Sequence, residues 1–258
     1  MQVIGIIPAR MSSSRFPGKP MKKIHGMPMI GHCYKRSIIS KSLKNCFVAT
    51  PDKEIYDYIN SINGKAVMTS HKHEMCNERV FEAVDKIEKL MKKKFDIIVN
   101  IQGDLPMIHP SMIDSLIQPL KRDKNVTNTT MVDDIISEND FLDKNRVKVI
   151  MDKNDDAILL TREPVPSIFK YKKKFNKYKH VAIRAYRRDI YNKIKKLKIT
   201  PIERIEGIDD LRLIENGIKI RITYTKKITE TVDTPKDLKK VIKMMDADKL
   251  MHRYLFNK

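Results

Sequence analysis

The chain has 258 residues and 41% hydrophobic residues, and its 52 lysine and arginine residues against 32 aspartate and glutamate residues give a formal net charge of +20. This composition excludes a disordered tail protein and predicts one large domain or two small ones around a deep core. The longest apolar runs fall far short of the roughly 20 residues that span a bilayer, and Met1–Gly5 has no basic segment ahead of its apolar residues, so we expect a cytoplasmic protein without a membrane partner.

Strands and helices alternate through the first hundred residues. Val3–Pro8 is a short apolar run that ends in a proline, which is typical of a buried strand that feeds a loop. The pattern then predicts helices over 28–39, 52–62 and 78–91 and strands over 45–49, 66–69 and 96–100. This order predicts a Rossmann-like α/β fold: a mixed, mostly parallel sheet with helices on both faces and a ligand crevice at the carboxyl ends of the strands.

The second half of the chain is less regular. It predicts strands over 147–151, 157–161, 181–186 and 218–224, helices over 188–196 and 201–215, and a last helix that begins at Pro235. The two prolines between 162 and 166 require extended backbone. No change in composition marks a boundary, so we expect a single domain over 1–258 with an inserted β-rich arm at roughly 140–190.

The loop after the first strand concentrates groups that bind anions. Within ten residues it carries two arginines, a lysine and three serines, namely Arg10, Ser12, Ser13, Ser14, Arg15 and Lys19. Guanidinium groups bind phosphate oxygens in pairs, a lysine adds a point charge, and the backbone N–H groups of a tight loop complete such a cradle. Neither GxxxxGK[ST] nor GxGxxG is present, so this is a phosphate loop of another kind.

Two aspartates have the chemistry of a magnesium site. Asp104 follows the apolar strand predicted over 96–100, and Asp233 lies just before the helix that begins at Pro235. Mg²⁺ takes one or two carboxylates together with phosphate oxygens and water. Asp233 alone would be interpreted as a simple helix cap, but with Asp104 it offers a second carboxylate for one metal ion.

Three motifs in series resemble the 3-deoxy-manno-octulosonate (Kdo) cytidylyltransferases, also called CMP-Kdo synthetases. They are IPAR followed by Arg15 and PGKP over 7–20, NIQGDLP over 100–106, and VDTP with Asp237 and Leu238 near the end. The first motif alone occurs in other sugar nucleotidyltransferases. All three occur in the order of that family across nearly the whole chain.

The resemblance implies transfer of CMP from CTP to the anomeric hydroxyl of a Kdo-like sugar acid, with release of pyrophosphate. It implies that Arg10, Arg15 and Lys19 bind the triphosphate with help from Ser13 or Ser14, that Asp104 and Asp233 bind Mg²⁺, and that Gln102 faces the sugar and the reacting phosphate. Arg10, Lys19, Asp104 and Asp233 are then the candidate catalytic residues. The same resemblance assigns Glu78, Arg79, Arg162 and His180 to substrate binding. It also implies a homodimer that forms through the β-rich arm and a role in assembling lipopolysaccharide or a related surface glycan.

Several positions depart from the family pattern. Where the family has Ser-Gly-Thr-Glu-Arg, this chain has Met75, Cys76 and Asn77 before Glu78 and Arg79. A tyrosine of the His-x-Gly-x-Tyr strand is replaced by Arg184, and a Glu-Gln pair is replaced by Asp209 and Asp210.

These departures leave two interpretations of the acceptor site. Arg184, Asp209 and Asp210 bind an acceptor that differs from Kdo, such as an amino-substituted or sialic-acid-like sugar acid or another anion. Alternatively, Arg184 pairs with one of the two aspartates as a structural bridge and Kdo is the substrate.

A different class of function is a non-catalytic protein that binds nucleotides or polyanions through its positive charge. Many of the lysines form short runs such as Lys92–Lys94, with few aromatic residues beside them, which is typical of solvated surfaces. We therefore expect anionic small molecules rather than nucleic acid as partners.

Overall fold

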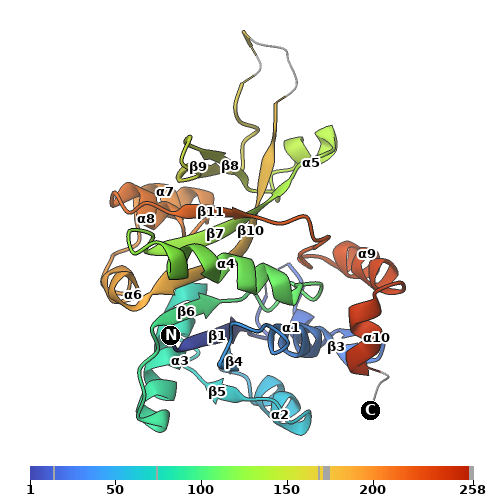
Figure 1. Ribbon diagram of the computed structural model, residues 1–258. Helices are drawn as coiled ribbons and strands as arrows, with labels where there is room; N and C mark the ends of the chain where they lie inside the picture. Colours follow the sequence, from blue (N-terminus) through green and yellow to red (C-terminus); the bar gives the residue numbers. More distant parts are fainter. Residues whose placement is uncertain (14, 74, 168, 171–174, 256–258) are drawn as a thin grey trace. The chain divides into compact units, whose positions relative to one another are not determined.

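The computed structural model describes residues 1–13, 15–73, 75–167, 169–170 and 175–255 (Figure 1). Contacts along the backbone divide the chain into two compact units. Unit 1 consists of Met1–Asp114 and Lys227–Lys258, and unit 2 consists of Ser115–Lys226. The single domain over 1–258 stays a prediction.

Unit 1 is built on four parallel strands in the order β6-β1-β4-β5. β1 (Val3–Pro8) lies between β6 (Ile97–Asn100) and β4 (Asn45–Thr50), and β5 (Ala66–Met68) pairs with β4. Every residue of β6 and nearly every residue of β1 and β4 is buried. Parallel strands are covered on both faces, which explains why these segments are continuous apolar runs. The loops that follow β1 and β6 leave the same edge of the sheet.

Three helices pack on this sheet, as the alternating pattern predicts. α1 (Met29–Ser37) contacts β1 and β4, α2 (Lys53–Ser61) packs on β4 and β5, and α3 (Cys76–Met91) packs on β1, β4 and β5 (Figure 1). α3 begins at Cys76, two residues before the predicted start at position 78.

The end of the chain returns to the loop that follows β1. A 3-10 helix, η1 (Lys19–Met21), and a small hairpin of β2 (Lys23–Ile24) and β3 (Met27–Pro28) precede α1, and α9 (Pro235–Met245) contacts β2. The apolar core they share consists of Phe16, Ile24, Met29, Met107, Val232, Val241, Met245 and Met251. Burial of these side chains holds the segment around Val232 against the loop around Phe16. A further helix, α10 (Lys249–Leu255), contacts α1.

Unit 2 contains five strands in a mixed sheet. β7 (Asn128–Asp134) pairs with β11 (Arg221–Tyr224) in parallel and with β10 (Tyr178–Arg187) antiparallel. β8 (Lys148–Met151) pairs with β10 and with β9 (Ala157–Thr161), both antiparallel. The core between this sheet and its helices consists of Val132, Val149, Leu160, Ile208, Leu211 and Ile222. The predicted strands of the β-rich arm are present in this unit.

The helices of unit 2 are short. They are α5 (Glu138–Leu142), α6 (Arg188–Ile194), α7 (Pro201–Glu206) and α8 (Leu211–Glu215), while α4 (Pro110–Arg122) begins in unit 1 and ends in unit 2. The prediction of one helix over 201–215 is wrong. Gly207 adopts a φ of 65°, a left-handed conformation that ends α7, and the chain turns before α8 begins.

Across the residues that the structure describes, no helix combines the length and the apolar character needed to cross a membrane.

Candidate active site

The loop after β1 is held in shape by its own backbone and by one carboxylate. The N–H of Gly18 donates to the carbonyl of Met11 at 2.9 Å, and Gly18 adopts a φ of 70° that favours glycine. The N–H of Met11 donates to Oδ2 of Asp52 at 2.8 Å. Asp52 precedes α2 as the predicted cap residue, but its carboxylate binds this loop and makes no capping bond. These two contacts close the loop and anchor it through its backbone.

Gly103 brings the end of β6 close to the end of β1. A Cβ atom at this position would lie 2.6 Å from the carbonyl oxygen of Pro8, which is a backbone atom and cannot move aside. Only glycine allows this approach. Asp104, the next residue, is thereby placed beside the loop that follows β1.

Lys19 joins the two predicted metal ligands. Its Nζ lies 2.7 Å from Oδ2 of Asp104 and 3.3 Å from Oδ1 of Asp233, and Arg15 binds the same Oδ1 at 3.0 Å. Burial by itself would lower the pKa of Lys19, but the charges of Asp104 and Asp233 outweigh that effect and raise the pKa above its ordinary value. Lys19 therefore stays a cation, and the four side chains form one charged cluster.

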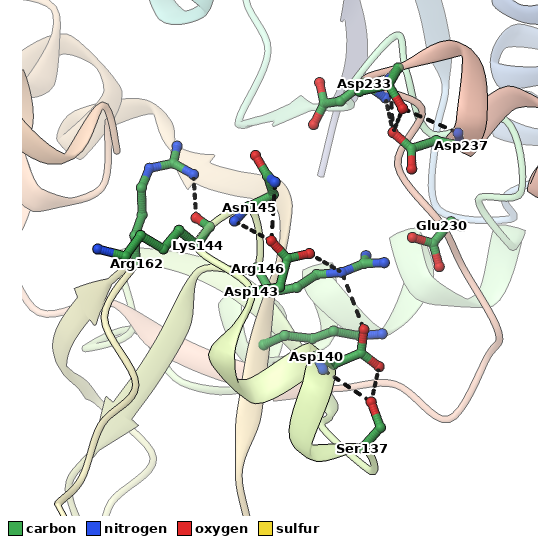
Figure 2. Close-up of polar contacts among 12 residues, drawn as sticks. Ser137, Asp140, Asp143, Lys144, Asn145, Arg146, Arg162, Glu230, Asp233 and Asp237 are labelled. Atoms are coloured by element: carbon green, nitrogen blue, oxygen red, sulfur yellow. Dashed lines mark hydrogen bonds and ion pairs between the residues drawn. The ribbon is translucent and has the colours of Figure 1, made fainter.

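Asp233 is not a simple helix cap. Thr234 is the cap residue of α9, and Oδ2 of Asp237 accepts hydrogen bonds from the backbone N–H groups of Thr234 at 2.8 Å and Asp233 at 3.1 Å (Figure 2). Because Asp237 satisfies the start of the helix, the carboxylate of Asp233 is available to Lys19 and Arg15. We therefore interpret Asp233 as a carboxylate of the candidate site and not as a helix cap.

A cavity of about 300 Å³ opens over this cluster. Its lining includes the predicted residues Arg10, Ser13, Arg15, Lys19, Arg79, Gln102, Asp104 and Asp233. Ser14 lies outside the described residues. The lining also includes Met75 and Cys76, two of the positions that depart from the family pattern.

Arg79 and Glu78 organise the loop that leads into α3. The guanidinium group of Arg79 is buried and donates to Oγ1 of Thr69 at 2.7 Å and to the carbonyls of Ser70 and His73. Arg10 reaches the same carbonyl of His73 at 3.3 Å. Glu78 is not part of the cavity lining, and its carboxylate accepts from the N–H of Met75 at 3.5 Å. Arg79 thus lines the cavity, and Glu78 supports the loop beside it. A role of either residue in substrate binding stays a prediction.

The donor set fits a hard divalent cation. Asp104 and Asp233 reach the same nitrogen of Lys19, so their oxygens are close enough to share a small cation beside bound phosphate. Among the described residues no group of three or more His, Cys, Asp or Glu side chains could hold a metal by itself. Two carboxylates completed by phosphate oxygens and water are the environment that Mg²⁺ accepts.

A second cluster of predicted residues lies within unit 2. Nε of Arg184 donates to Oδ1 of Asp210 at 2.7 Å, and Nη1 lies 3.5 Å from Oδ2 of Asp209. Nε2 of His180 lies 2.6 Å from Oγ1 of Thr130 and 3.3 Å from Oδ2 of Asp210. A register shift in β10 between Val181 and Arg184 allows both His180 and Arg184 to reach this point opposite β7.

Charge and burial define the state of this second cluster. Burial lowers the pKa of His180 to about 4, so the imidazole is neutral near pH 7, and burial raises the pKa of Asp209. The Arg184 guanidinium is buried and contacts both aspartates. The geometry contains the structural bridge that we considered for Arg184, and an additional contact of Arg184 with substrate stays a prediction.

Arg162 is held by backbone and carboxylate contacts in unit 2. Its Nε donates to the carbonyl of Glu206 at 2.8 Å. Its Nη1 donates to the carbonyl of Lys144 at 3.0 Å (Figure 2). Nζ of the buried Lys148 donates to three carbonyls, those of Asp143, Arg146 and Arg162, at 2.6 to 2.8 Å. Burial lowers the pKa of Lys148. Lys148 thus ties the loop over 143–146 to the backbone of Arg162.

An anion-binding loop and paired carboxylates at the carboxyl edge of a parallel sheet are the features of an enzyme that handles nucleotide phosphates, and a cytidylyltransferase family model matches residues 4–222. The 3-deoxy-manno-octulosonate cytidylyltransferase of Thermodesulfovibrio yellowstonii is 40% identical over 96% of this chain and 99% of its own length. That of Geobacter metallireducens is 37% identical over 95% of this chain and 98% of its own.

A solved structure of CMP:2-keto-3-deoxy-manno-octonic acid synthetase complexed with CTP matches with a TM-score of 0.85 and 35% identity, and covers 95% of this chain and 98% of that one. The chain belongs to the 3-deoxy-manno-octulosonate cytidylyltransferase family and is a CTP-dependent nucleotidyltransferase. The predicted family, the α/β fold class and the enzyme class are confirmed. Cytidylyltransferases of this family generally use a divalent metal ion.

Proposed function

We propose that this chain transfers CMP from CTP to the anomeric hydroxyl of Kdo and releases pyrophosphate. The observation that carries the proposal is the cavity in unit 1, where three cationic side chains of one loop and two carboxylates converge at the carboxyl edge of the sheet. The relatives that share nearly the full length of the chain are named for this reaction with Kdo, which supports the choice of acceptor.

Each side chain of the cavity has a task that follows from its charge. Arg10, Arg15 and Lys19 bind the triphosphate, because guanidinium and ammonium groups are the natural partners of phosphate oxygens. Asp104 and Asp233 hold Mg²⁺. The bound metal neutralises charge on the phosphates and on the departing pyrophosphate.

The transfer is a displacement at phosphorus. The anomeric oxygen of the acceptor forms a bond to the α-phosphorus of CTP, the bond from that phosphorus to the β-phosphate oxygen breaks, and the proton of the hydroxyl passes to water. No side chain has to act as a nucleophile, so the protein contributes by positioning the reactants and by stabilising charge. Lys19 is suited to the second task because it stays protonated beside the leaving group.

The acceptor residues remain proposals that rest on chemistry. His180 is neutral near pH 7 and suited to hydrogen bonding with a sugar hydroxyl or carboxylate. Asp209, Asp210, Arg184 and Arg162 are proposed to shape the acceptor site with it. The pairing of Arg184 with two aspartates supports Kdo itself over an acceptor with an additional anionic group.

The same proposal includes the surroundings of the enzyme. We propose a homodimer that works in the cytoplasm and supplies an activated sugar acid for a cell-surface glycan. The homodimer and the supply of a glycan rest on the family resemblance, and the cytoplasm on the charge of the nucleotide substrate and product.

The test is release of pyrophosphate from CTP and Mg²⁺ with Kdo, an amino-substituted Kdo and a sialic acid supplied in parallel. We expect turnover with Kdo and a loss of at least about 100-fold in Asp104→Ala, because that change removes a metal ligand and a partner of Lys19. The matched control is Asp57→Ala, which removes an exposed carboxylate of α2 outside the cavity.

Each outcome separates the proposals. Turnover with the amino-substituted or sialic acceptor alone would replace Kdo and retain the reaction. Binding of CTP without turnover of any acceptor would contradict the proposed acceptors. Salt-dependent binding of polyanions without pyrophosphate release would favour the non-catalytic alternative.

A further inference from the structure

Cys76 differs from the other two cysteines in its surroundings. It is the first residue of α3, it lines the cavity of the candidate active site, and its side chain is partly exposed. Cys33 and Cys46 are buried in the core of unit 1. Burial raises the pKa of both of those thiols, to about 12 for Cys46. Cys76 is therefore the cysteine that a ligand in the cavity can reach.

The sulfur of Cys76 lies between two side-chain amides at the end of β6. Nδ2 of Asn100 and Nε2 of Gln102 each lie 3.5 Å from Sγ, within the range of a hydrogen bond to sulfur. Asn100 is fully buried, and its Nδ2 also donates to Oδ1 of the buried Asn77 at 3.0 Å. Asn100 and Asn77 thus fix the sulfur from the interior, and Gln102 contacts it at the cavity.

The backbone of Gln102 has little freedom of its own. The following residue, Gly103, lies so close to the carbonyl of Pro8 that no side chain fits there, and the N–H of Ile101 donates to the carbonyl of Ile6 at 2.9 Å. What remains variable is the rotation of the Gln102 side chain, and the contact with Cys76 restricts it. A glycine at position 76, as in the family pattern, would give the amide of Gln102 no partner at this point.

We propose that Cys76 is a positioning residue that orients the amide of Gln102 in the nucleotide cavity. This inference rests on the proposed function and on the prediction that Gln102 faces the sugar and the reacting phosphate. A buried network that fixes one polar group restricts the rotamers of that group and lowers the entropy lost on binding. A residue that only filled space would act on stability and not through Gln102.

The first experiment locates Cys76 relative to the nucleotide and needs no turnover. N-ethylmaleimide should label one thiol per chain in the folded protein, and this label should be absent in Cys76→Ser. CTP with Mg²⁺ should slow the labelling at least about tenfold, whereas free cytidine should slow it less. Labelling that is unchanged at saturating CTP would overturn the placement of Cys76 at the bound nucleotide.

The second experiment is a double-mutant cycle with Cys76→Ala and Gln102→Ala, measured both on kcat with Kdo and on the affinity for CTP. We expect Cys76→Ala to lower at least one of the two quantities about tenfold in the native background and less than about twofold in Gln102→Ala. Cys76→Ser should recover most of the loss, because its hydroxyl can also accept from the amide. Thermal unfolding of each variant shows whether it remains folded.

Two results would contradict the inference. Equal effects of Cys76→Ala in both backgrounds would show that Cys76 does not act through Gln102. No effect in either quantity would show that the contact is dispensable. Failure of the proposed reaction is a different result: the native protein would turn over no acceptor, while the CTP-affinity arm and the labelling arm still report on Cys76.

Discussion

The geometry of the site depends on the absence of a Cβ atom at Gly103. An added methyl group would have to move either β1 or the peptide that carries Asp104, since its neighbour at 2.6 Å is a backbone oxygen. A displacement of about 1 Å at a catalytic carboxylate can cost about 100-fold in rate. We expect Gly103→Ala to lower kcat/KM for CTP by at least about tenfold, measured by pyrophosphate release.

Gly217→Ala is the contrasting variant for this prediction. Gly217 has a φ of 69°, but no atom lies within 4 Å of the position that an added methyl group would take, so the change strains the backbone without a collision. It should lower the free energy of unfolding by about 1 kcal/mol and leave turnover largely intact. A similar loss of turnover in both variants would mean that strain, and not the close approach at Gly103, limits the site.

His32 links a single residue to the acid stability of unit 1. Its Nε2 lies 2.8 Å from the carbonyl of Ile24 and its Nδ1 lies 2.6 Å from Oη of Tyr254, so the neutral ring donates from Nε2 and accepts at Nδ1. Burial lowers the pKa of His32 to about 4, whereas the unfolded chain has an ordinary pKa near 6.5. Between these values only the unfolded chain takes up the proton.

The sign of the pH dependence follows from this uptake. The contribution of His32 to stability is complete above about pH 6.5 and is lost as the pH falls toward 4, at up to about 1.4 kcal/mol per pH unit. His180 acts in the same direction in unit 2, because burial lowers its pKa to about 4 as well. Denaturant unfolding at pH values of about 7.5 and about 5 should show a smaller loss in His32→Gln than in the native protein. An equal loss would contradict the assignment.

At the scale of elements, a buried ion pair links α7 to α8. Nε and Nη2 of Arg212 donate to the two carboxylate oxygens of Glu203 at 2.8 and 2.5 Å, and both side chains are almost fully buried. Removing one partner of such a pair leaves a buried charge and costs about 3 to 5 kcal/mol. Glu203→Ala should therefore increase hydrogen exchange of the α7 amides strongly.

The matched control replaces both partners. Glu203→Leu with Arg212→Leu leaves no uncompensated charge, so its loss of stability should be clearly smaller than that of Glu203→Ala. If the double variant were the less stable of the two, the specific hydrogen bonds of the pair would matter more than the avoidance of an unpaired charge.

The elements of this protein differ in how far the sequence predicts them. The strands of unit 1 are continuous apolar runs, and the helices between them carry apolar residues at helical spacing. Both patterns can be recognised in the sequence without knowledge of distant contacts. The sequence pattern predicts no element over 110–134, where the structure has α4 and β7. The residues of β7 are polar at several positions yet mostly buried. β7 lies between β10 and β11, and the side chains of Asn128, Thr129 and Thr130 donate hydrogen bonds to backbone carbonyls elsewhere in unit 2. Such burial depends on partners far away in the sequence.

For the whole molecule, the net charge of +20 predicts how CTP arrives. A positive field steers an anion toward the protein, and salt screens that field over about 10 Å at 0.1 M and about 3 Å at 1 M. The association rate of CTP should fall about tenfold between low salt and about 0.5 M NaCl, with a much smaller change in the dissociation rate. Stopped-flow binding measures both rates.

Cytidine serves as the neutral control for this prediction. It lacks phosphates, so its association rate should change little with salt. Equal salt dependence for cytidine and CTP would mean that salt acts on the protein itself, and that the net charge does not steer the nucleotide.

The sequence alone determined the chemistry of this protein, and the tertiary structure decided which residues share it. The apolar strands, the cationic loop with Arg10 and Lys19, and the aspartate after β6 are local patterns, so they could be predicted with the family and the reaction class. The contact of Lys19 with Asp233 joins segments 214 residues apart, because packing of the C-terminal helices against the first loop brings them together. The same holds for the partners of Cys76, whereas the pairing of Arg184 with an aspartate was one of two interpretations that the sequence left open. Local sequence patterns do not predict such contacts, because the contacts form only when distant apolar surfaces are buried together.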